Sequence, residues 1–173
     1  MIVLPVTYTP IATQTLASAA ASVTFSSISG TYTDLVLVCN AKNDTAANQR
    51  LQLNFNGDYA FSYSYTRLYG SGTAAISDRF SAESVIDLGF FGGTNTTGYL
   101  QSITNIQNYS NATTFKSVLN RWNSQAGASG AQYTAAVIGL WRNTSTINTL
   151  ALSFNSANIA AGSTFTLYGI KSA

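Results

Sequence analysis

Histidine is absent from the 173-residue sequence, and Cys39 is its only cysteine. Most nucleophile–base pairs and most zinc or copper sites use one of these two residue types. Their scarcity argues against a hydrolytic triad and a soft-metal centre, and we expect no metal and no cofactor. One cysteine cannot form a disulfide within the chain. Because residues 35–39 are all apolar, we expect Cys39 to be a small buried side chain.

Charged residues are also few, at 8% of the sequence against about a quarter in an average soluble domain. Serine, threonine, asparagine and glutamine must therefore cover most of the exterior. Such a surface suits a subunit held in a larger assembly, so we expect a homo-oligomer. The eight basic residues are scattered singly, and the sequence therefore predicts no nucleic-acid binding.

Long apolar segments are missing as well. No stretch approaches the roughly 18 apolar residues that cross a bilayer, and residues 1–5 lack the basic region and long apolar core of a signal peptide. We therefore expect no membrane anchor, and a protein made and kept in the cytoplasm of the cell that produces it.

What the sequence does contain is a period-two pattern from end to end. Short segments rich in Thr, Val, Ile, Tyr and Phe alternate with clusters of Gly, Asn and Ser, which is typical of antiparallel sheets. The pattern predicts a single all-β domain over residues 1–173, an antiparallel β-sandwich of jelly-roll-like type. The predicted strands are residues 8–16, 22–28, 34–41, 50–55, 62–69, 83–88, 98–109, 114–122, 132–142, 149–154 and 163–171.

Local patterns within these segments set further expectations. Residues 35–39 are predicted to form a central strand covered on both faces, with another chain over the second face if this chain cannot cover it. Asn56-Gly57 predicts a type I′ hairpin turn, because both residues accept a positive φ. Glycines predict loops at residues 92–93 and 125–130.

Six carboxylates are the remaining source of acid–base chemistry, and a glycosidase needs two of them about 5 to 10 Å apart. Asp78, Glu83 and Asp87 form the nearest group. Glu83 and Asp87 have the same parity on one predicted strand, so a polysaccharide-degrading enzyme would use this pair. Solvated carboxylates at a loop edge explain both residues as well, and we favour that interpretation. The sequence therefore predicts no enzyme.

One segment carries an unusual set of aromatic side chains. Every second residue of 61–69 is Phe, Tyr or Arg, so an extended strand places them on one face. This face is either a platform for sugars or a partner chain, or a row of half-buried strand residues. The adjacent pairs Arg121-Trp122 and Trp141-Arg142 have the same two interpretations, and subunit contact is the preferred functional one. The candidates for an interface or a glycan site are Phe61, Tyr63, Tyr65, Arg67, Tyr69, Arg121, Trp122, Trp141 and Arg142.

Seven segments spread along the chain form a distinctive set: YTPIA (8–12), VTFSSI (23–28), YTDLVLV (32–38), FNGD (55–58), YSYTRLYG (63–70), GLWR (139–142) and FTLYGIK (165–171). As a set they resemble a group of small virion proteins of tailed phages, cyanophages among them, over essentially the whole chain. The resemblance implies a β-sandwich on the virion surface and brings no catalytic residues. Tyr-Ala-Phe at 59–61 departs from the smaller polar residues of that group.

The leading hypothesis is a capsid decoration or cement protein, expected to be a trimer, that binds the phage major capsid protein or other virion proteins. Binding only to the assembled lattice would stabilise that state by linkage. Residues 1–16, with Pro5 and Pro10, are expected to form an extended arm on a neighbouring subunit. The alternative is a receptor-binding tail-fibre or head-fibre knob that recognises host glycans. Either hypothesis places the protein on the virion surface after synthesis in the host cytoplasm.

Overall fold

The computed structural model describes residues 7–45, 47–90, 98–124 and 132–171. Within these residues the chain is all β, with twelve strands and no helix. The strands are β1 (Tyr8–Thr15), β2 (Ser22–Phe25), β3 (Asp34–Ala41), β4 (Arg50–Phe55), β5 (Tyr63–Gly70), β6 (Ala75–Glu83), β7 (Ile86–Phe90), β8 (Leu100–Gln107), β9 (Lys116–Ser124), β10 (Tyr133–Trp141), β11 (Leu150–Phe154) and β12 (Thr164–Ile170).

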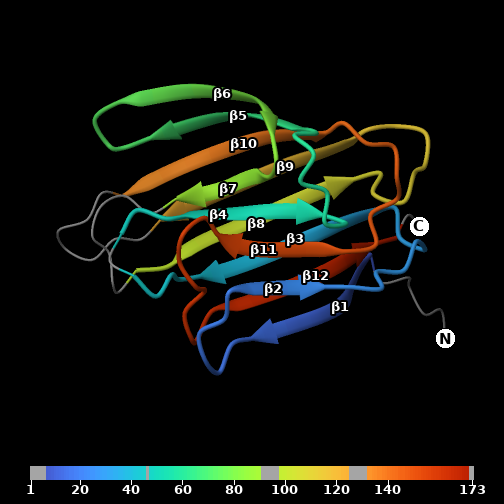
Figure 1. Cartoon of the computed structure of the whole chain (residues 1–173), viewed down its shortest axis with the longest axis horizontal. Helices are drawn as coiled ribbons and strands as arrows, with labels where there is room; N and C mark the ends of the chain where they lie inside the picture. The colour runs from blue at the N-terminus through green and yellow to red at the C-terminus, as the bar shows by residue number, and fades with distance from the viewer. Residues whose placement is uncertain (1–6, 46, 91–97, 125–131, 172–173) are drawn as a thin grey trace.

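The strands form two antiparallel sheets (Figure 1). The large sheet has eight strands in the order β1-β12-β3-β8-β9-β10-β5-β6, and the small sheet has four in the order β2-β11-β4-β7. The chain crosses repeatedly from one sheet to the other, as from β1 to β2 and from β2 to β3, in the manner of a jelly roll. The structure confirms the predicted sandwich and adds an unequal division of the strands.

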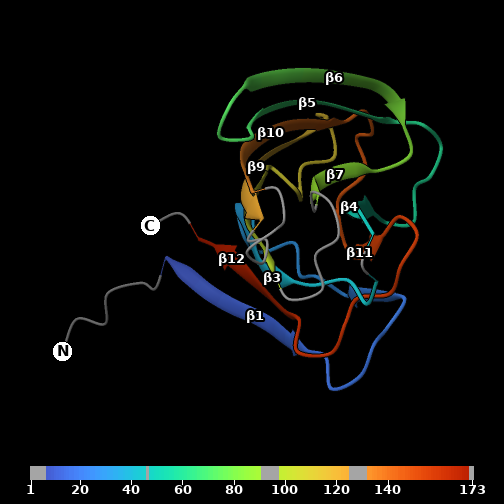
Figure 2. The same ribbon diagram turned by 90° about the vertical axis from the view of Figure 1, so that its left-hand side faces the viewer.

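Alternating side chains build the core between the sheets. Leu51, Leu53 and Phe55 of β4 are fully buried, and so are Phe165 and Leu167 of β12. Because every second side chain of a strand points inward, the two inner faces form one continuous apolar cluster. Figure 2 shows the large sheet curving around the small one, so the edge strand β7 lies under β5 and β10.

Eleven of the twelve strands share at least three residues with a predicted segment, whereas β6 shares only Glu83 with the predicted strand 83–88 and was otherwise missed. Its inward positions are Ile76, Asp78 and Phe80, as their pairing with β5 shows. A charged residue at the centre of the inward row hides the alternation of apolar and polar side chains. The sequence therefore carries only a weak signal for β6, although the strand pairs with β5 in the structure.

The turn after β4 has the predicted conformation but a different role. Asn56 and Gly57 have φ values of 53° and 68°, and the amide of Asp58 donates to the carbonyl of Phe55 at 2.9 Å. These features confirm a type I′ turn. The predicted hairpin is wrong, however, because β4 belongs to the small sheet and β5 to the large one. The turn instead carries the chain from one sheet to the other.

The N-terminal segment is part of the sandwich over most of its described length. Tyr8–Thr15 forms β1, an edge strand that pairs with β12 of the same chain. Residues 1–16 were expected to form an arm on a neighbouring subunit. Tyr8–Thr15 does not do so here, because its backbone hydrogen bonds are made to β12 of the same subunit. Residues 1–6 lie outside the described residues, and so do the predicted loops at 92–93 and 125–130.

Strand β3 is central, as predicted, but only one of its faces is fully covered. Leu35, Leu37 and Cys39 point into the core, and burial raises the pKa of the Cys39 thiol to about 12. The predicted small buried thiol is thus confirmed. On the opposite face Val36 is buried, whereas Val38 is exposed. The chain itself leaves this second face partly open.

Candidate interaction surface

The predicted aromatic stripe points into the core rather than to the surface. Tyr63, Tyr65 and Trp141 are buried, and the Tyr63 ring stacks on Trp141 with centroids 6.2 Å apart. The Tyr63 hydroxyl also accepts a hydrogen bond from the Phe55 amide at 2.9 Å. Parity showed that these residues share a face, and the fold turns that face inward. The predicted surface platform is therefore wrong for these three residues, which belong to the core.

The other predicted site residues divide between core and surface. Trp122 is buried, with its ring centroid 5.0 Å from that of Phe90, and Tyr69 is half-buried against the same Phe90 ring. Arg121 is exposed on the large sheet. Phe61 lies outside β5, so it does not share the inward face of the strand residues. Its side chain is 65% exposed.

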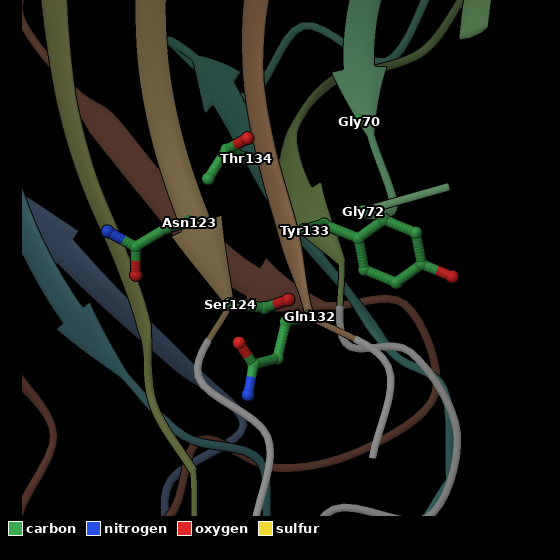
Figure 3. Close-up of a pocket in the computed structure, with 7 residues that line it drawn as sticks. All are labelled: Gly70, Gly72, Asn123, Ser124, Gln132, Tyr133 and Thr134. Atoms are coloured by element: carbon green, nitrogen blue, oxygen red, sulfur yellow. The ribbon is translucent and has the colours of Figure 1, made fainter. Parts of the chain in front are cut away.

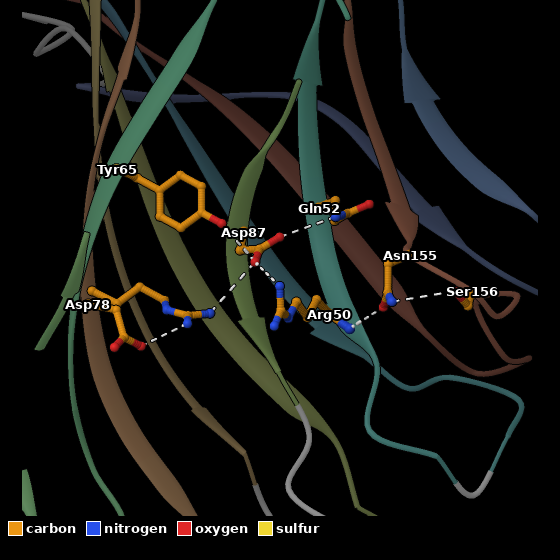
Figure 4. A network of polar contacts seen from close by, with 8 residues as sticks. Arg50, Gln52, Tyr65, Asp78, Asp87, Asn155 and Ser156 are labelled. Carbon is orange, nitrogen blue, oxygen red and sulfur yellow. Dashed lines mark hydrogen bonds and ion pairs between the residues drawn. The ribbon is translucent and has the colours of Figure 1, made fainter. Parts of the chain in front are cut away.

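A buried polar network around Asp87 lies where the large sheet curves over β7 (Figure 4), and Arg67 belongs to it through its contacts with Asp78 and Asp87. Its side chain is 6% exposed and lies 2.9 Å from Asp78 and 3.6 Å from Asp87. Tyr65 Oη donates to Asp87 at 2.9 Å, and Arg50 Nη1 lies 3.5 Å from the same carboxylate. Two arginines and two aspartates thus neutralise one another and tie β5 and β6 of the large sheet to β4 and β7 of the small one.

This network overturns the interpretation of Asp87 as a solvated loop-edge carboxylate. The Asp87 side chain is 2% exposed, because Tyr65 and Arg67 of β5 lie against it. Glu83 ends β6 while Asp87 lies in β7, so the two residues do not share one strand. Three donors already occupy the Asp87 carboxylate, from Arg50, Gln52 and Tyr65. The arrangement serves packing between the sheets and leaves this carboxylate without access to a substrate.

A second set of polar contacts shapes the loop between β4 and β5, residues 56–62, which we call the aromatic loop. The Asp58 carboxylate accepts hydrogen bonds from the Ala60 amide (2.9 Å), Ser62 Oγ (2.7 Å), Trp141 Nε1 (2.7 Å) and Asn143 Nδ2 (3.4 Å). One carboxylate therefore joins both ends of the loop to the end of β10. The loop is held in shape from beneath.

The aromatic loop displays two large rings to solvent. Tyr59 is 59% exposed, and Phe61 adopts a φ of 57°, in the left-handed region that non-glycine residues rarely enter. Arg142 Nη2 donates to the carbonyl of Phe61 at 2.9 Å and to that of Tyr63 at 3.3 Å. The predicted candidate Arg142 thus acts as the support of an exposed ring. Tyr59 was not among the predicted site residues, although residues 59–61 depart from the smaller polar residues of the phage group that the sequence resembles.

Lys116 braces the neighbouring loops at the same end of the sandwich. It is fully buried, and its Nζ donates to the carbonyls of Thr114 (2.6 Å) and Thr144 (3.1 Å). Burial lowers the pKa of Lys116. Phe115, the residue before it, is exposed. Asp58 and Lys116 together therefore fix three loops at this end: the aromatic loop, the loop before β9 and the loop after β10. The first two expose aromatic rings.

Asp58→Asn is expected to lower the free energy of unfolding by about 1 to 3 kcal/mol at neutral pH. Desolvation raises the pKa of Asp58, but its hydrogen bonds together outweigh this effect and hold the pKa below its ordinary value. The carboxylate therefore stabilises the fold above the unfolded pKa of about 4, and this contribution is lost as the pH falls through the folded pKa. Urea unfolding of both proteins from neutral pH down to about pH 2 measures the effect.

The difference between wild type and Asp58→Asn should shrink at the acid end of that range. Glu83→Gln is the matched control, since it removes a carboxylate outside this set of hydrogen bonds. A difference that stayed constant over the whole pH range would contradict the assigned role of Asp58.

The most extended candidate surface is the side of the large sheet that points away from the small sheet, which we call the outer face. We define it over β3, β8, β9, β10 and β5, whose outward side chains are partly or fully exposed except for the buried Val36 of β3. Pairing aligns its side chains in rows. One row is Val38, Ile103, Arg121, Ala136 and Leu68, and the next is Val36, Asn105, Leu119, Ile138 and Thr66.

The two rows lie at the centre of the outer face and carry five exposed apolar side chains. The row on each side of them is mostly polar, with Asn40, Gln101, Asn123 and Thr134 in one and Gln107, Ser117, Leu140 and Ser64 in the other.

Arg121 is the one charged side chain in the two central rows, and Asp34 is the only other charged residue at an outward position of the five strands, which the structure describes completely. Arg67 and Lys116 also belong to these strands, but both are buried on the inner side. Monomeric soluble proteins rarely leave large contiguous apolar patches in water, and such patches mark interaction sites. The exposed apolar residues of the rows are Val38, Leu68, Ile103, Leu119 and Ile138.

One part of the outer face is hollowed into a groove of about 740 Å³. Val38, Ile103 and Ala136 supply apolar lining, and Arg121 lies among them. Two further strand residues, Asn40 and Asn123, also line the groove, and the side-chain oxygen of each is buried with no hydrogen-bond partner among the described residues. The groove therefore has an apolar lining, and the two unpaired oxygens are buried beneath its surface.

A smaller hollow of about 390 Å³ lies at the ends of β5, β9 and β10 (Figure 3). Polar side chains dominate its lining. Ser124 and Gln132 flank residues 125–131, which are outside the described part of the chain, so we assign it no role. The lining residues are Gly70, Gly72, Asn123, Ser124, Gln132, Tyr133 and Thr134.

Two further features bear on the class of site. Among the described residues, no group of three or more His, Cys, Asp or Glu side chains is placed to hold a metal ion. In the same residues, no helix has the length and apolar character needed to span a bilayer. No protein-family model, curated protein or solved structure matches the chain.

Proposed function

We propose that this protein is a non-catalytic structural component of a phage particle, a capsid decoration protein that buries its outer face against the particle. The observation that carries the proposal is the outer face itself, with five exposed apolar side chains on neighbouring strands and Arg121 as the one charge in its two rows. Association removes such surface from water, which is favourable. The likeness of seven segments to small virion proteins of tailed phages supports the phage part of the proposal.

The size of the outer face supports a stable contact. Five strands about 4.8 Å apart and seven residues with a rise of about 3.3 Å give roughly 550 Å². A standard interface buries about 800 Å² per partner. The outer face and its rim therefore supply most of one interface.

The opposite side of the sandwich supports one orientation. Outward positions of the small sheet include Ser22 and Thr24 of β2 and Ser153 of β11, which are polar and small. This side is suited to water, whereas the outer face is suited to protein. The protein would therefore sit with its large sheet against the particle and its small sheet toward solvent.

A second candidate function is a receptor-binding knob. The observation that favours it is the aromatic loop, where Tyr59 and Phe61 are exposed and held in place by Asp58 and Arg142. Exposed aromatic rings stack against the apolar faces of sugars. Glycan-array binding that is lost in Tyr59→Ala and Phe61→Ala would favour this function. Tyr63 and Tyr65 are unsuitable for that test, because both are buried.

Leu119→Lys combined with Ile138→Lys is expected to weaken binding to the capsid at least tenfold. The two side chains pair across β9 and β10, so the double variant places two adjacent charges where an apolar contact is proposed. The measurement is co-sedimentation of the purified protein with empty capsids of the phage whose genome encodes this chain. Thr24→Lys on the small sheet is the matched control and should bind like wild type.

Antibody labelling of intact particles tests the location independently. Labelled heads support the proposal. Labelling confined to the tail, or particles that carry no label, would contradict it, and so would a Leu119→Lys/Ile138→Lys variant that binds capsids as well as wild type.

A further inference from the structure

We propose that the aromatic loop of one copy inserts into the groove of a neighbouring copy, so that copies join head to tail in a closed ring. The groove is part of the outer face, so this inference deepens the proposed function and rests on it only in assigning that face to protein contact. It names a second copy of this chain as the partner at the groove. Leu119 and Ile138 lie in the adjoining row and do not line the groove, so the contact with the capsid is proposed at that row and the contact with a second copy at the groove.

The loop side of the contact rests on Phe61. Its backbone is in the left-handed region, with a φ of 57°, and its ring is 65% exposed. Both features cost free energy within the subunit. Arg142 nevertheless holds the Phe61 carbonyl at 2.9 Å, and Asp58 anchors the loop from below. A loop held in this shape presents its ring to a partner without further ordering cost.

The groove side offers what the two exposed rings lack. Ala136, Val38 and Ile103 form an apolar lining for the ring of Phe61. Tyr59 is also exposed, so its ring can contact the same apolar lining.

Arg121 adds an electrostatic complement to the same contact. Its guanidinium is exposed and forms no ion pair with any described residue. A cation over the face of an aromatic ring is attracted by the ring quadrupole, and the attraction grows when water is excluded. Tyr59 and Phe61 are both suited to that position. The groove and the loop therefore complement each other in apolar surface and in the pairing of a cation with aromatic rings.

The fold places the loop and the groove too far apart to meet within one subunit. Ala136 lines the groove, whereas Arg142 supports the loop, and six residues along β10 and its end span about 20 Å. The contact must then be made between copies and uses two different surfaces. Such heterologous contacts close into rings when the rotation allows it, and the expected trimer is one such ring.

The first test is the mass of the isolated protein by sedimentation equilibrium. Wild type is expected to be a closed oligomer, whereas Tyr59→Ser/Phe61→Ser and Ile103→Lys/Ala136→Lys are expected to be monomers. Phe115→Ser is the matched control, since it removes an exposed ring at the same end without changing the aromatic loop. Thermal unfolding of each variant shows that the sandwich is retained.

The second test traps the contact directly in the full-length protein. Cys39 is buried, with a raised pKa, so new surface cysteines react without interference from it. Copies carrying Ala60→Cys, mixed with copies carrying Gln101→Cys, are expected to form a disulfide-linked heterodimer under mild oxidation. Ala60→Cys mixed with Ser22→Cys, on the opposite sheet, should remain unlinked.

Three results would overturn the inference. They are a monomeric wild type, a loop variant that keeps the wild-type mass, and equal cross-linking of the Gln101→Cys and Ser22→Cys partners. Loop variants that lose glycan binding but keep the oligomer would assign the aromatic loop to sugars instead. These tests use the isolated protein, so they are independent of capsid binding. If the protein forms the oligomer but does not bind capsids, only the proposed function is refuted. If it is a monomer that binds capsids, only the contact between the loop and the groove is refuted.

Discussion

Replacing Asp87 by alanine is expected to lower the free energy of unfolding by about 3 to 5 kcal/mol, because it leaves Arg67 as an incompletely compensated buried charge. The Arg67 side chain is 6% exposed, and Asp87 lies 3.6 Å from its guanidinium. The substitution also removes the acceptor of the Tyr65 hydroxyl, which donates to Asp87 at 2.9 Å. Urea unfolding of the two proteins measures the difference.

Two further variants separate the charge effect from the loss of packing. Asp78→Ala is expected to cost less, since Asp78 is 32% exposed and Arg67 would keep Asp87. Adding Arg67→Met to Asp87→Leu should recover part of the stability lost in Asp87→Ala, because apolar pairs often replace buried ion pairs without loss. An Asp87→Ala protein as stable as wild type would show that the network contributes nothing to the fold.

Trp141→Ala is expected to cost a similar amount, about 3 to 5 kcal/mol, through the cavity that it opens. Trp141 is fully buried, 5.4 Å from the Phe55 ring and stacked on Tyr63. Its indole also donates to Asp58 at 2.7 Å, so the variant weakens the anchor of the aromatic loop. The free energy of unfolding and the oligomer mass are the two measurements.

Trp141→Phe is the informative control, because it keeps most of the ring packing and removes the hydrogen bond to Asp58. Its loss of stability should fall between those of wild type and Trp141→Ala. Arg121→Ala, on the exposed outer face, should change the free energy of unfolding by less than about 0.5 kcal/mol. If Trp141→Ala were as stable as wild type and lost only binding, Trp141 would be an interface residue as first predicted.

The strands were predictable because a strand side chain has two directions and the sequence alternates accordingly. Residues 34–41 and 50–55 match β3 and β4 at both ends. The type I′ turn at Asn56-Gly57 was predictable for a similar reason, since few residue pairs accept two positive φ values. The pairing partners of the strands were not predictable, and the turn therefore joined two sheets instead of forming a hairpin.

The aromatic stripe shows the limit of the same argument. Parity correctly placed Tyr63, Tyr65 and Arg67 on one face, but parity does not say whether that face meets water or another sheet. Phe61 satisfied the parity rule and still lies outside the strand, because its left-handed backbone breaks the alternation. The most exposed ring of residues 61–69 is therefore that of Phe61, the residue whose backbone does not continue the strand alternation.

The buried network and the groove were beyond any local argument. Arg67 and Asp87 are twenty residues apart and lie in different sheets, so their contact depends on how the large sheet curves over β7. The groove is lined by residues of β3, β8, β9 and β10, which become neighbours only through the strand order. In both cases the chemistry of each residue was visible in the sequence, and its partner was not.

The sequence by itself determined the all-β class, the positions of most strands, the buried thiol and the low charge of the surface. Each of these follows from residue type and local spacing, which act over a few residues. The tertiary structure alone decided which aromatic rings are buried, which carboxylate is enclosed and which sheet face is left apolar and open. Those outcomes depend on strand order and sheet curvature, which arise from contacts between residues far apart in the chain.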